Sequence, residues 1–397
     1  MEKFDVVIIG GGAAGLTATL AVNKNVVLLE RSERVGRKLS ATGNGQGNVG
    51  NENMSESRYF TSGERRLISS CLEKFGQDKV LAFFGRIGFV FCSDEKGRIY
   101  PSSRQASSIT DLIRYRLAPE KNKRIETDAF VTDIDKSGAL FVVTADCGGE
   151  KKKFAAEKVL LCTGGKAAKN FGTDGNGYAL AQKFGHSVTA LFPSLVQLKT
   201  ETRDIKSLKG QRVAAAVKAY CEGALIAEEK GDVIFTDYGV SGDAVFRISA
   251  FVSDKIERGI ALSVDLLPET DEKTLCGIIA ERLKNTALPE SETLCGILPN
   301  VVGRAVIKRA GGTDARTLSR IIKNFTLKVV GTTGFDYAQV TKGGVRLSEV
   351  GDDMQSKKVG GLYFAGEILD ADGQCGGYNL QWAFSSALAA AESINHD

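Results

Sequence analysis

Short apolar runs separated by glycine-rich turns dominate the hydrophobic pattern at the start of the chain. Residues 4–9 read Phe-Asp-Val-Val-Ile-Ile, which is typical of a strand buried on both faces of a sheet. Gly10–Gly15 follows, then a small-residue helix expected over Leu16–Val22, and a second buried strand over Val26–Leu29 closed by Glu30. The pattern therefore predicts a strand–turn–helix–strand unit.

The turn of this unit has the G-x-G-x-x-G spacing in the context that makes the motif informative. Gly10 permits a tight turn, Gly12 lets backbone amides approach a pyrophosphate, and Gly15 lets the helix pack closely on the strand. The helix N-terminus adds amide donors and a partial positive charge, and Glu30 would accept hydrogen bonds from a ribose diol. We predict a Rossmann-type dinucleotide-binding domain; a glycine-rich turn that binds nothing is the alternative.

Further glycine-rich segments occur in the next 140 residues. Thr42–Asn48 holds three glycines and two asparagines, so it is either a solvent loop or a loop that contacts a ligand. Two alternating segments, Ala129–Ile134 and Leu140–Ala145, predict a small hairpin. A third buried strand, Lys158–Cys162, ends in Thr163-Gly-Gly and is expected to return the chain to the nucleotide sheet. The stretch Gly172–Gly177 lacks a preceding buried strand, so we interpret it as a helix entry rather than a second fingerprint.

The region after residue 190 carries no nucleotide signal and is interpreted as an insertion. Its first part has mixed β character with one helix expected over Asp243–Ile256, and residues 270–325 have helical spacing. We therefore expect four segments: the first part of the nucleotide domain (1–190), an inserted β-rich domain (191–267), a small helical subdomain (268–328) and the rest of the nucleotide domain (329–397). The strands expected in the insertion are Leu195–Thr200, Val213–Tyr220, Ala224–Glu229, Val233–Thr236 and Ala261–Leu266.

The C-terminal region repeats the combination of strand, glycine turn and helix. An apolar strand ends in Gly366-Glu367, and the turn Cys375–Trp382 precedes an Ala-rich helix expected over Phe384–Ile394. A nicotinamide dehydrogenase has no need of such a second segment. FAD does, because its ribityl chain and isoalloxazine extend to a second contact, where an acid and a helix N-terminus would stabilise the reduced flavin. FAD is therefore favoured as the tightly bound cofactor.

Composition narrows the class of protein. The 397 residues contain 52 Lys+Arg against 48 Asp+Glu, a net charge of only +4, so a clustered basic excess and a nucleic-acid partner are not expected. The 8 cysteines form no C-x-x-C pair and only 2 histidines are present, so no zinc pattern can be assembled. The apolar stretch near the N-terminus follows acidic residues and is too short to span a membrane, so we expect a cytoplasmic protein with reduced thiols.

Several motifs together resemble the bacterial flavoproteins of the HI0933-like group, which includes BaiN-type steroid reductases and proteins described as aminoacetone oxidases. The most specific is the run Gly-Leu-Tyr-Phe-Ala-Gly-Glu followed by Gly-Gly-Tyr-Asn-Leu-Gln-Trp-Ala. The resemblance spans nearly the whole chain and implies an α/β fold with three parts: a Rossmann-type FAD-binding domain like that of glutathione reductase, an inserted β-barrel-like domain, and a small helical domain. The segments that carry it are Gly10–Gly15, Gly36–Asn48, Gly97–Ser108, Phe235–Gly242 and Gly361–Gln381.

The resemblance also implies the FAD contacts, with Val131 at the position whose backbone meets adenine in related flavoproteins. The full set of expected cofactor-binding residues is Gly10, Gly12, Ala14, Gly15, Glu30, Arg31, Lys38, Thr42, Gly43, Asn44, Gly45, Asn48, Val131, Thr163, Gly164, Gly165, Gly366, Glu367, Gly377, Asn379, Leu380 and Gln381.

Three departures from the family pattern matter. The first helix is about one turn shorter than usual. Because a whole turn is removed, the side chains of the helix should still point in approximately the same directions. The loop reads Gly45-Gln-Gly-Asn48 where relatives have Gly-Arg-Cys-Asn, so any role of that Arg or Cys is absent. Many relatives have His where Asp237 stands, so a His general acid cannot be carried over.

Candidate catalytic groups are few. Asp237 and Tyr238 precede a tight turn in the insertion, where a cap over the flavin would point inward; a turn residue and a packed ring are the alternatives. We assign no role to His186 and His396. Further candidates, each with a surface or packing role as the alternative, are Arg98, Tyr100, Arg104, Cys375 and Tyr378.

The leading functional hypothesis is an FAD-dependent oxidoreductase that acts on a small organic molecule. It would reduce an activated C=C bond with NAD(P)H, bound transiently, or with another electron donor. Oxygen-dependent oxidation of an amine or amino-ketone is the second enzyme hypothesis. A tRNA-modifying flavoprotein and a non-catalytic flavin sensor are alternatives from other classes; the sequence leaves substrate, donor and oligomeric state open.

Overall fold

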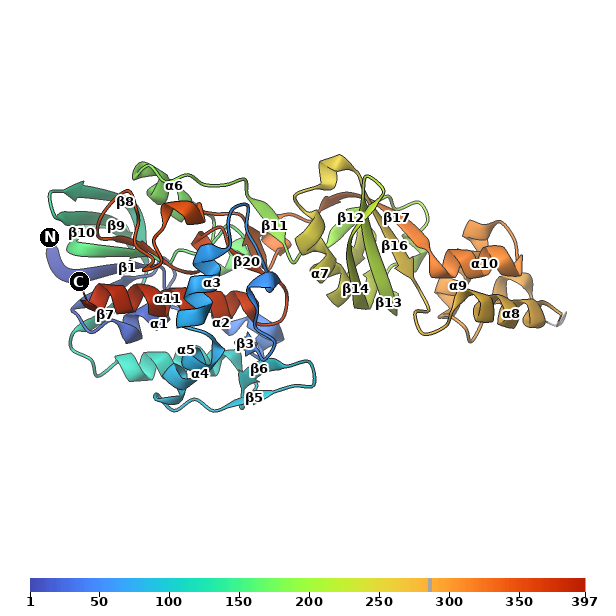
Figure 1. Cartoon of the computed structure of the whole chain (residues 1–397), viewed down its shortest axis with the longest axis horizontal. Coiled ribbons are helices and arrows are strands. Elements are labelled where there is room, and N and C mark those ends of the chain that lie inside the picture. Colours follow the sequence, from blue (N-terminus) through green and yellow to red (C-terminus); the bar gives the residue numbers. More distant parts are fainter. Residues whose placement is uncertain (285–287, 397) are drawn as a thin grey trace. The chain divides into compact units, whose positions relative to one another are not determined.

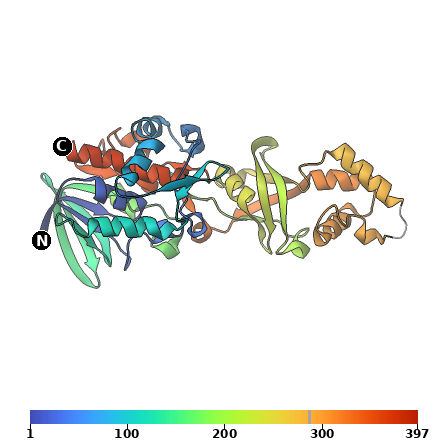
Figure 2. The same ribbon diagram turned by 90° about the horizontal axis from the view of Figure 1, so that it is seen from below.

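The chain folds into two compact units, seen in a computed structural model that describes residues 1–284 and 288–396. The first unit combines residues 1–191 with residues 340–397, and the second holds residues 192–339. Figure 1 labels the elements of both units, and Figure 2 gives the same ribbon turned by 90°.

A seven-stranded mixed sheet forms the centre of the first unit. Its order is β7-β2-β1-β10-β9-β8, and β19 also pairs with β10. β1, β2, β7 and the second half of β10 run parallel, while β10, β9 and β8 form an antiparallel meander. The strands are β1 (Glu2–Ile9), β2 (Val26–Leu29), β7 (Lys123–Glu126), β8 (Ala129–Ser137), β9 (Leu140–Cys147), β10 (Glu150–Leu161) and β19 (Leu362–Phe364).

The long strand β10 explains how two kinds of pairing share one sheet. Its first part begins with four polar residues at the surface and pairs antiparallel with β9, whereas its end, Val159–Leu161, is fully buried and pairs parallel with both β1 and β19. Burial on both faces is what continuous apolar strands require. The parallel strands therefore end at one edge of the sheet, which is where ligands bind in folds of this kind.

Helices cover the sheet, and small apolar side chains let them approach closely. α1 (Ala13–Ala21) packs against α11 (Tyr378–His396), whose interior from Trp382 to Ala391 is buried. The remaining helices of this unit are α2 (Arg37–Ser40), α3 (Arg66–Lys74), α4 (Gln77–Gly85), α5 (Ala106–Leu117) and α6 (Asn176–Lys183).

Short strands complete the first unit beside α11. One three-stranded sheet has the order β3-β6-β5, and a two-stranded sheet joins β20 to β4. These strands are β3 (Gly50–Asn51), β4 (Tyr59–Phe60), β5 (Phe91–Ser93), β6 (Arg98–Pro101) and β20 (Asp372–Gly373). A further short strand of this unit, β18 (Val340–Lys342), belongs to neither sheet.

The second unit is a closed barrel with the strand order β12-β15-β14-β13-β16-β17, and closure removes the exposed sheet edges. Its core includes Val217, Phe235, Val264 and Phe325, and the three later helices pack on the same core. The elements are β11 (Phe192–Ser194), β12 (Leu198–Thr200), β13 (Arg212–Cys221), β14 (Ala224–Phe235), β15 (Gly239–Ser241), α7 (Asp243–Val252), β16 (Ile260–Asp265), α8 (Glu272–Leu283), α9 (Asn300–Ala310), α10 (Ala315–Lys323) and β17 (Phe325–Thr332).

The expected class, a Rossmann-type fold with an inserted barrel, is confirmed, but several boundaries differ. The return expected at residue 329 falls inside β17, whose side chains alternate between the barrel core and solvent, and the chain rejoins the first unit at residue 340. The expected helical subdomain is not a separate compact unit, since its helices share the barrel's core. The two strands expected over 224–236 are one strand, and the C-terminal helix begins six residues earlier than expected, at Tyr378.

Candidate functional site

The first glycine turn lies at the carboxyl edge of the sheet, between β1 and α1. Gly10 has a φ of 104°, and a Cβ there would lie 2.4 Å from the carbonyl oxygen of Cys162. A Cβ on Gly15 would lie 1.9 Å from the carbonyl oxygen of Gly10, so these two positions admit no side chain. A Cβ on Gly12, by contrast, would have nothing within 4 Å. Gly10 and Gly15 are required by packing, and Gly12 faces open space.

The carboxylate of Glu30 is fixed beside this turn. It accepts hydrogen bonds from the backbone N–H of Gly11 at 2.7 Å and of Ser32 at 2.8 Å, one on each oxygen. Each carboxylate oxygen has a second lone pair, so Glu30 can still accept hydrogen bonds from two hydroxyls of a ligand. This is the capacity that a ribose diol needs.

A second cluster lies where β2 and β8 meet the start of α6. Arg31 forms an ion pair with Asp174 at 2.7 Å, which lowers the pKa of this carboxyl against the effect of its burial, and stacks at 4.5 Å on the ring of Phe130. The side-chain amide of Asn176 donates to the carbonyl oxygen of Val131 at 3.4 Å. The sequence interpretation treated Gly172–Gly177 only as a helix entry and so missed Asp174 and Asn176; the glycine-flanked Asp-Gly-Asn was the available signal.

Lys38 and Glu367 form an ion pair, although 329 positions separate them. Lys38 Nζ lies 2.7 Å from one oxygen of Glu367, and the other oxygen accepts the backbone N–H of Thr341 at 2.9 Å. The hydroxyl oxygen of Thr341 in turn accepts the backbone N–H groups of Lys166 at 2.8 Å and Ala167 at 2.9 Å. Four chain segments are therefore tied together, and Thr341 is a member that sequence reasoning missed.

The turn after β10 packs tightly on this network. A Cβ on Gly165 would lie 2.4 Å from the Thr341 hydroxyl oxygen, and Gly164 has a φ of 71°. The Thr163 hydroxyl is buried without a hydrogen-bond partner, and a Cβ on Gly177 would lie 1.8 Å from it. Thr163 is thus covered by α6, so only its backbone is available to a ligand.

The loop expected to contact a ligand is held in an uncommon conformation. Gly43 and Asn44 have φ values of 59° and 54°, and the hydroxyl of Thr42 anchors the turn by donating to the carbonyl oxygen of Leu39 at 2.7 Å. A Cβ on Gly45 would have nothing within 4 Å. The loop presents open backbone rather than side chains.

The start of α11 packs against this loop. Asn48, with its amide oriented to satisfy both polar atoms, donates to the carbonyl oxygen of Gly50 at 2.9 Å and accepts the N–H of Gly377 at 3.1 Å. A Cβ on Gly377 would lie 2.3 Å from that same carbonyl oxygen of Gly50. Asn379 pairs with Gly373 through two hydrogen bonds of 2.8 Å. The N-terminus of α11 is therefore rigidly placed.

Two of the predicted contacts on α11 cannot use their side chains freely. Gln381 is buried and donates to the Ser385 hydroxyl at 2.8 Å, and the amide of Asn379 is committed to Gly373. Leu380 is half-buried. Any contact from Asn379 and Gln381 to a cofactor would come from the backbone of the first helical turn, where free N–H groups are found.

The two ends of the chain meet at this edge. A Cβ on Gly366 would lie 3.1 Å from the Cβ of Ala14 and 3.8 Å from that of Ala383, which joins the turn after β19 to α1 and α11. The glycine turn, the acidic residue after β2, the 42–48 loop and the start of α11 all belong to the first unit. The structure thus assembles most of the residues expected to bind FAD on one unit.

Asp237 and Tyr238 lie in the second unit, in the turn between β14 and β15. Asp237 is exposed and forms an ion pair with Lys209 at 2.7 Å, and this hydrogen bond lowers the pKa of Asp237. Asp237 is therefore a carboxylate at neutral pH and not a proton donor. Tyr238 is half-buried. Their catalytic role stays a prediction.

Tyr100, in contrast, lies in the first unit beside the turn that begins α11. The residue is 5% exposed, and the guanidinium carbon of Arg104 lies 4.2 Å from the ring centroid. Burial raises the pKa of Tyr100; Arg98 and Arg104 lower it, and Asp94 and the thiol of Cys375 raise it further. The structure brings together Tyr100, Arg104 and Cys375, which the sequence treated as separate candidates.

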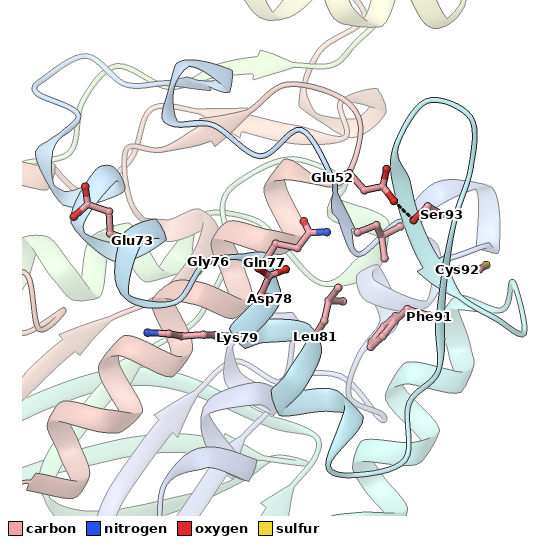
Figure 3. Close-up of a pocket in the computed structure, with 11 residues that line it drawn as sticks. Glu52, Glu73, Gly76, Gln77, Asp78, Lys79, Leu81, Phe91, Cys92 and Ser93 are labelled. Atoms are coloured by element: carbon pink, nitrogen blue, oxygen red, sulfur yellow. Dashed lines mark hydrogen bonds between the residues drawn. The ribbon is translucent and has the colours of Figure 1, made fainter.

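A hollow of about 650 Å³ lies between α4 and β5, on the face of β6 opposite the one that carries Tyr100. Figure 3 shows Leu81 and Phe91 in its apolar part and Glu52 hydrogen-bonded to Ser93 at its edge. Gln77, also in its wall, accepts the backbone N–H of Asn51 at 2.9 Å. This hollow does not include the residues predicted to bind FAD.

The first unit fits an elongated dinucleotide such as FAD on its own geometry. Gly12 and Gly45 leave open space beside backbone amides, Glu30 has free acceptor capacity, and the N-terminus of α11 is fixed nearby by Asn48. Helix N-termini favour anionic groups, which suits the pyrophosphate at α1 and the reduced flavin at α11.

Comparison with known proteins agrees with this geometry. The model of the HI0933-like protein Rossmann domain matches residues 4–393. The chain belongs to this family. A relative from Clostridium scindens, a 3-dehydro-bile acid delta(4,6)-reductase, is 37% identical, with 96% of this chain and 97% of that protein covered. The ribosomal RNA dihydrouridine synthase of Escherichia coli is 29% identical, with 99% and 98% covered.

The solved structure of 3-ketosteroid delta1-dehydrogenase from Sterolibacterium denitrificans shares the fold of this HI0933-like protein, with a TM-score of 0.57 and 12% identity over the whole of both chains. The expected family and the Rossmann-type FAD-binding fold are thereby confirmed, and the protein is an FAD-dependent oxidoreductase. Among the described helices, no segment is long and apolar enough to cross a membrane.

Proposed function

We propose that this protein reduces a C=C bond conjugated to a carbonyl group in a small organic substrate. The observation that carries the proposal is the 37% identity, over 96% of the chain, to a protein whose name describes reduction of such bonds in a bile acid. Bound FAD, once reduced, supplies the hydride for this reaction.

The residues of the first unit would bind and orient the cofactor. Gly12 and the first turn of α1 would meet the pyrophosphate, Glu30 the ribose diol, and the backbone around Val131 the adenine. Lys38 and Glu367 hold the middle of the site as a half-buried ion pair. Because these groups are fixed before binding, little ordering is required when the cofactor enters.

The electron donor is proposed to be NAD(P)H, bound transiently. The test mixes the purified holoprotein with NADH or NADPH without oxygen and follows the flavin absorbance, then adds the steroid enone androstenedione to the reduced protein. We expect bleaching by a nicotinamide and recovery of the oxidised spectrum on addition of the enone. Bleaching by amines alone, with recovery in oxygen, would instead support an amine oxidase and contradict the proposal.

Reduction of uridine in ribosomal RNA is a second candidate. Two curated relatives, from Escherichia coli and Haemophilus influenzae, are ribosomal RNA dihydrouridine synthases, and each match covers at least 98% of this chain. A uracil ring also carries a C=C bond conjugated to a carbonyl, so the same chemistry would apply. Mass spectrometry of ribosomal nucleosides from a strain lacking the gene decides between them: loss of dihydrouridine supports RNA, and an unchanged level supports the small-molecule proposal.

A further inference from the structure

The strand β6 separates two surfaces of the first unit. β6 pairs antiparallel with β3, so that Arg98 lies opposite Asn51 and Ile99 lies opposite Gly50. Residues directly opposite each other share a face, and neighbours along a strand alternate. Tyr100 therefore shares a face with Arg98 and Asn51, while Ile99 lines the hollow on the other side.

The face that carries Tyr100 is joined to the start of α11. The side-chain amide of Asn51 donates to the carbonyl oxygen of Gly376 at 3.0 Å, and the thiol of the preceding Cys375 is close enough to influence the ionisation of Tyr100. Gly376 and Gly377 form the turn before the helix that we propose lies beside the flavin. Tyr100 is thus placed at the edge of the proposed flavin site.

The hydroxyl of Tyr100 is available for chemistry. Its ring is buried, but the hydroxyl makes no hydrogen bond to another described residue. Unlike the hydroxyl of Tyr178, which is also unpartnered, it is not sealed from solvent. A buried ring with a free, reachable hydroxyl is a fixed proton donor, since burial keeps the phenol protonated at neutral pH.

Arg104 holds a strained conformation to cover this ring. Its φ is 52°, an uncommon value for a residue other than glycine, and its guanidinium lies over the ring of Tyr100. The side chain also reaches Gln46 of the 42–48 loop, at 3.5 Å. Backbone strain of this kind persists where the surroundings demand it and is concentrated at functional sites. A cation over the ring stabilises the phenolate that remains after proton donation.

We propose that Tyr100 is the proton donor of the reduction and that Arg104 is the residue that positions it. The proposal rests on the proposed function. In the balanced step the flavin, once bound and reduced, would supply a hydride to the β carbon of the enone, the π electron pair would move to the α carbon, and the phenolic proton of Tyr100 would join that carbon. The tyrosinate then regains a proton from water.

The central experiment compares Tyr100→Phe with Tyr115→Phe, a matched change at a tyrosine that is 76% exposed on α5. Each holoprotein is reduced with dithionite, and flavin reoxidation is followed with cyclohexenone and with nitrocyclohexene. Loss of a general acid typically slows a reaction by about 10²–10⁴-fold, so we expect that loss for cyclohexenone in Tyr100→Phe only. Nitrocyclohexene yields a stable nitronate without a proton donor, so its reoxidation rate should be preserved.

A second readout needs no turnover. In a spectrophotometric titration of the FAD-free protein, the number of phenols with a raised pKa should be one lower in Tyr100→Phe than in wild type. Arg104→Met should raise the pKa of this phenol further, and Arg104→Lys should restore it. The FAD content of every variant reports whether the fold is intact.

The outcomes separate the two proposals. If wild-type protein reduces neither probe, the proposed function fails. If it reduces cyclohexenone and Tyr100→Phe does so at the same rate with FAD bound, Tyr100 is not the proton donor and the inference is overturned. Equal losses with both probes also overturn it, because they would show that hydride delivery was disturbed rather than proton donation.

Discussion

Two glycines of the same turn serve different purposes. A Cβ on Gly15 would lie 1.9 Å from the carbonyl oxygen of Gly10, whereas a Cβ on Gly12 would have open space within 4 Å. Gly12 also has a φ of −82°, which any residue adopts. Packing alone therefore requires Gly15, and Gly12 is explained by a ligand that approaches the backbone.

This difference gives a paired prediction. Gly12→Ala should leave the free energy of unfolding within about 0.5 kcal/mol of wild type, because the methyl group meets no protein atom. It should weaken FAD binding, because the methyl group occupies the space proposed for the pyrophosphate. Gly15→Ala should destabilise the apoprotein by about 1–3 kcal/mol through overpacking. Urea denaturation of the apoprotein and fluorescence titration with FAD measure the two effects; equal stability losses would contradict this assignment.

His186, to which the sequence analysis gave no role, is buried in the first unit. Its Nε2 lies 2.7 Å from the Ser356 hydroxyl, and its Nδ1 lies 3.2 Å from a carboxylate oxygen of Glu349, without the alignment of a hydrogen bond. Burial lowers the pKa of His186, although Glu349 opposes this; Lys358 adds to the lowering. Burial raises the pKa of Glu349, but hydrogen bonds from Lys358 and Ser187 outweigh it and bring this pKa to about 2.

The lowered pKa of His186 makes the stability of the fold depend on pH. The unfolded chain binds a proton at His186 below a pH of about 6.5, whereas the folded protein resists protonation there. Stability should therefore be complete above about pH 6.5 and fall as the pH decreases, by at most about 1.4 kcal/mol per pH unit for one group. Urea denaturation between pH 5 and 8 should show a smaller slope in His186→Gln than in wild type. An identical slope would contradict the prediction.

At the scale of elements, Thr341 shows how the segment after β10, which has no regular secondary structure at this point, is held in place. Its hydroxyl oxygen accepts two backbone N–H groups of the segment after β10, and its own N–H is bound by Glu367. The side chain is 1% exposed, so these groups have no access to water. One side chain thus satisfies backbone groups that the sheet cannot reach.

Replacement of Thr341 tests this arrangement. Thr341→Val keeps the shape but leaves two N–H groups without an acceptor, and an unsatisfied buried group costs about 1–3 kcal/mol. We expect a loss of stability in that range and weaker FAD binding, because Gly165 packs on this hydroxyl and Glu367 accepts the backbone N–H of the same residue. Thr341→Ser retains the oxygen and should restore both properties. Calorimetry and FAD titration are the measurements, and failure of the Ser variant to restore them would contradict the role of the hydroxyl.

At the scale of the molecule, the first unit is built from two distant parts of the chain. The second unit is inserted between residues 191 and 340. Sequence analysis placed the entry into the insertion within one residue of the structural boundary, because nucleotide signals stop there. It placed the return eleven residues too early, because β17 alternates like any half-buried strand and its pattern does not say which sheet it joins.

The sequence by itself determined the local units of this protein. The buried strand β2 has the bounds expected from its apolar run, and the roles expected for Gly10 and Gly15 match their close contacts, since these features depend on residues near one another in the chain. Only the tertiary structure decided which segments meet. The pairing of Lys38 with Glu367, the anchoring of Ala167 by Thr341 and the approach of Tyr100 to Cys375 join residues that are far apart in the chain. Local patterns of polarity set the period and burial of an element, but they carry no information about its partner.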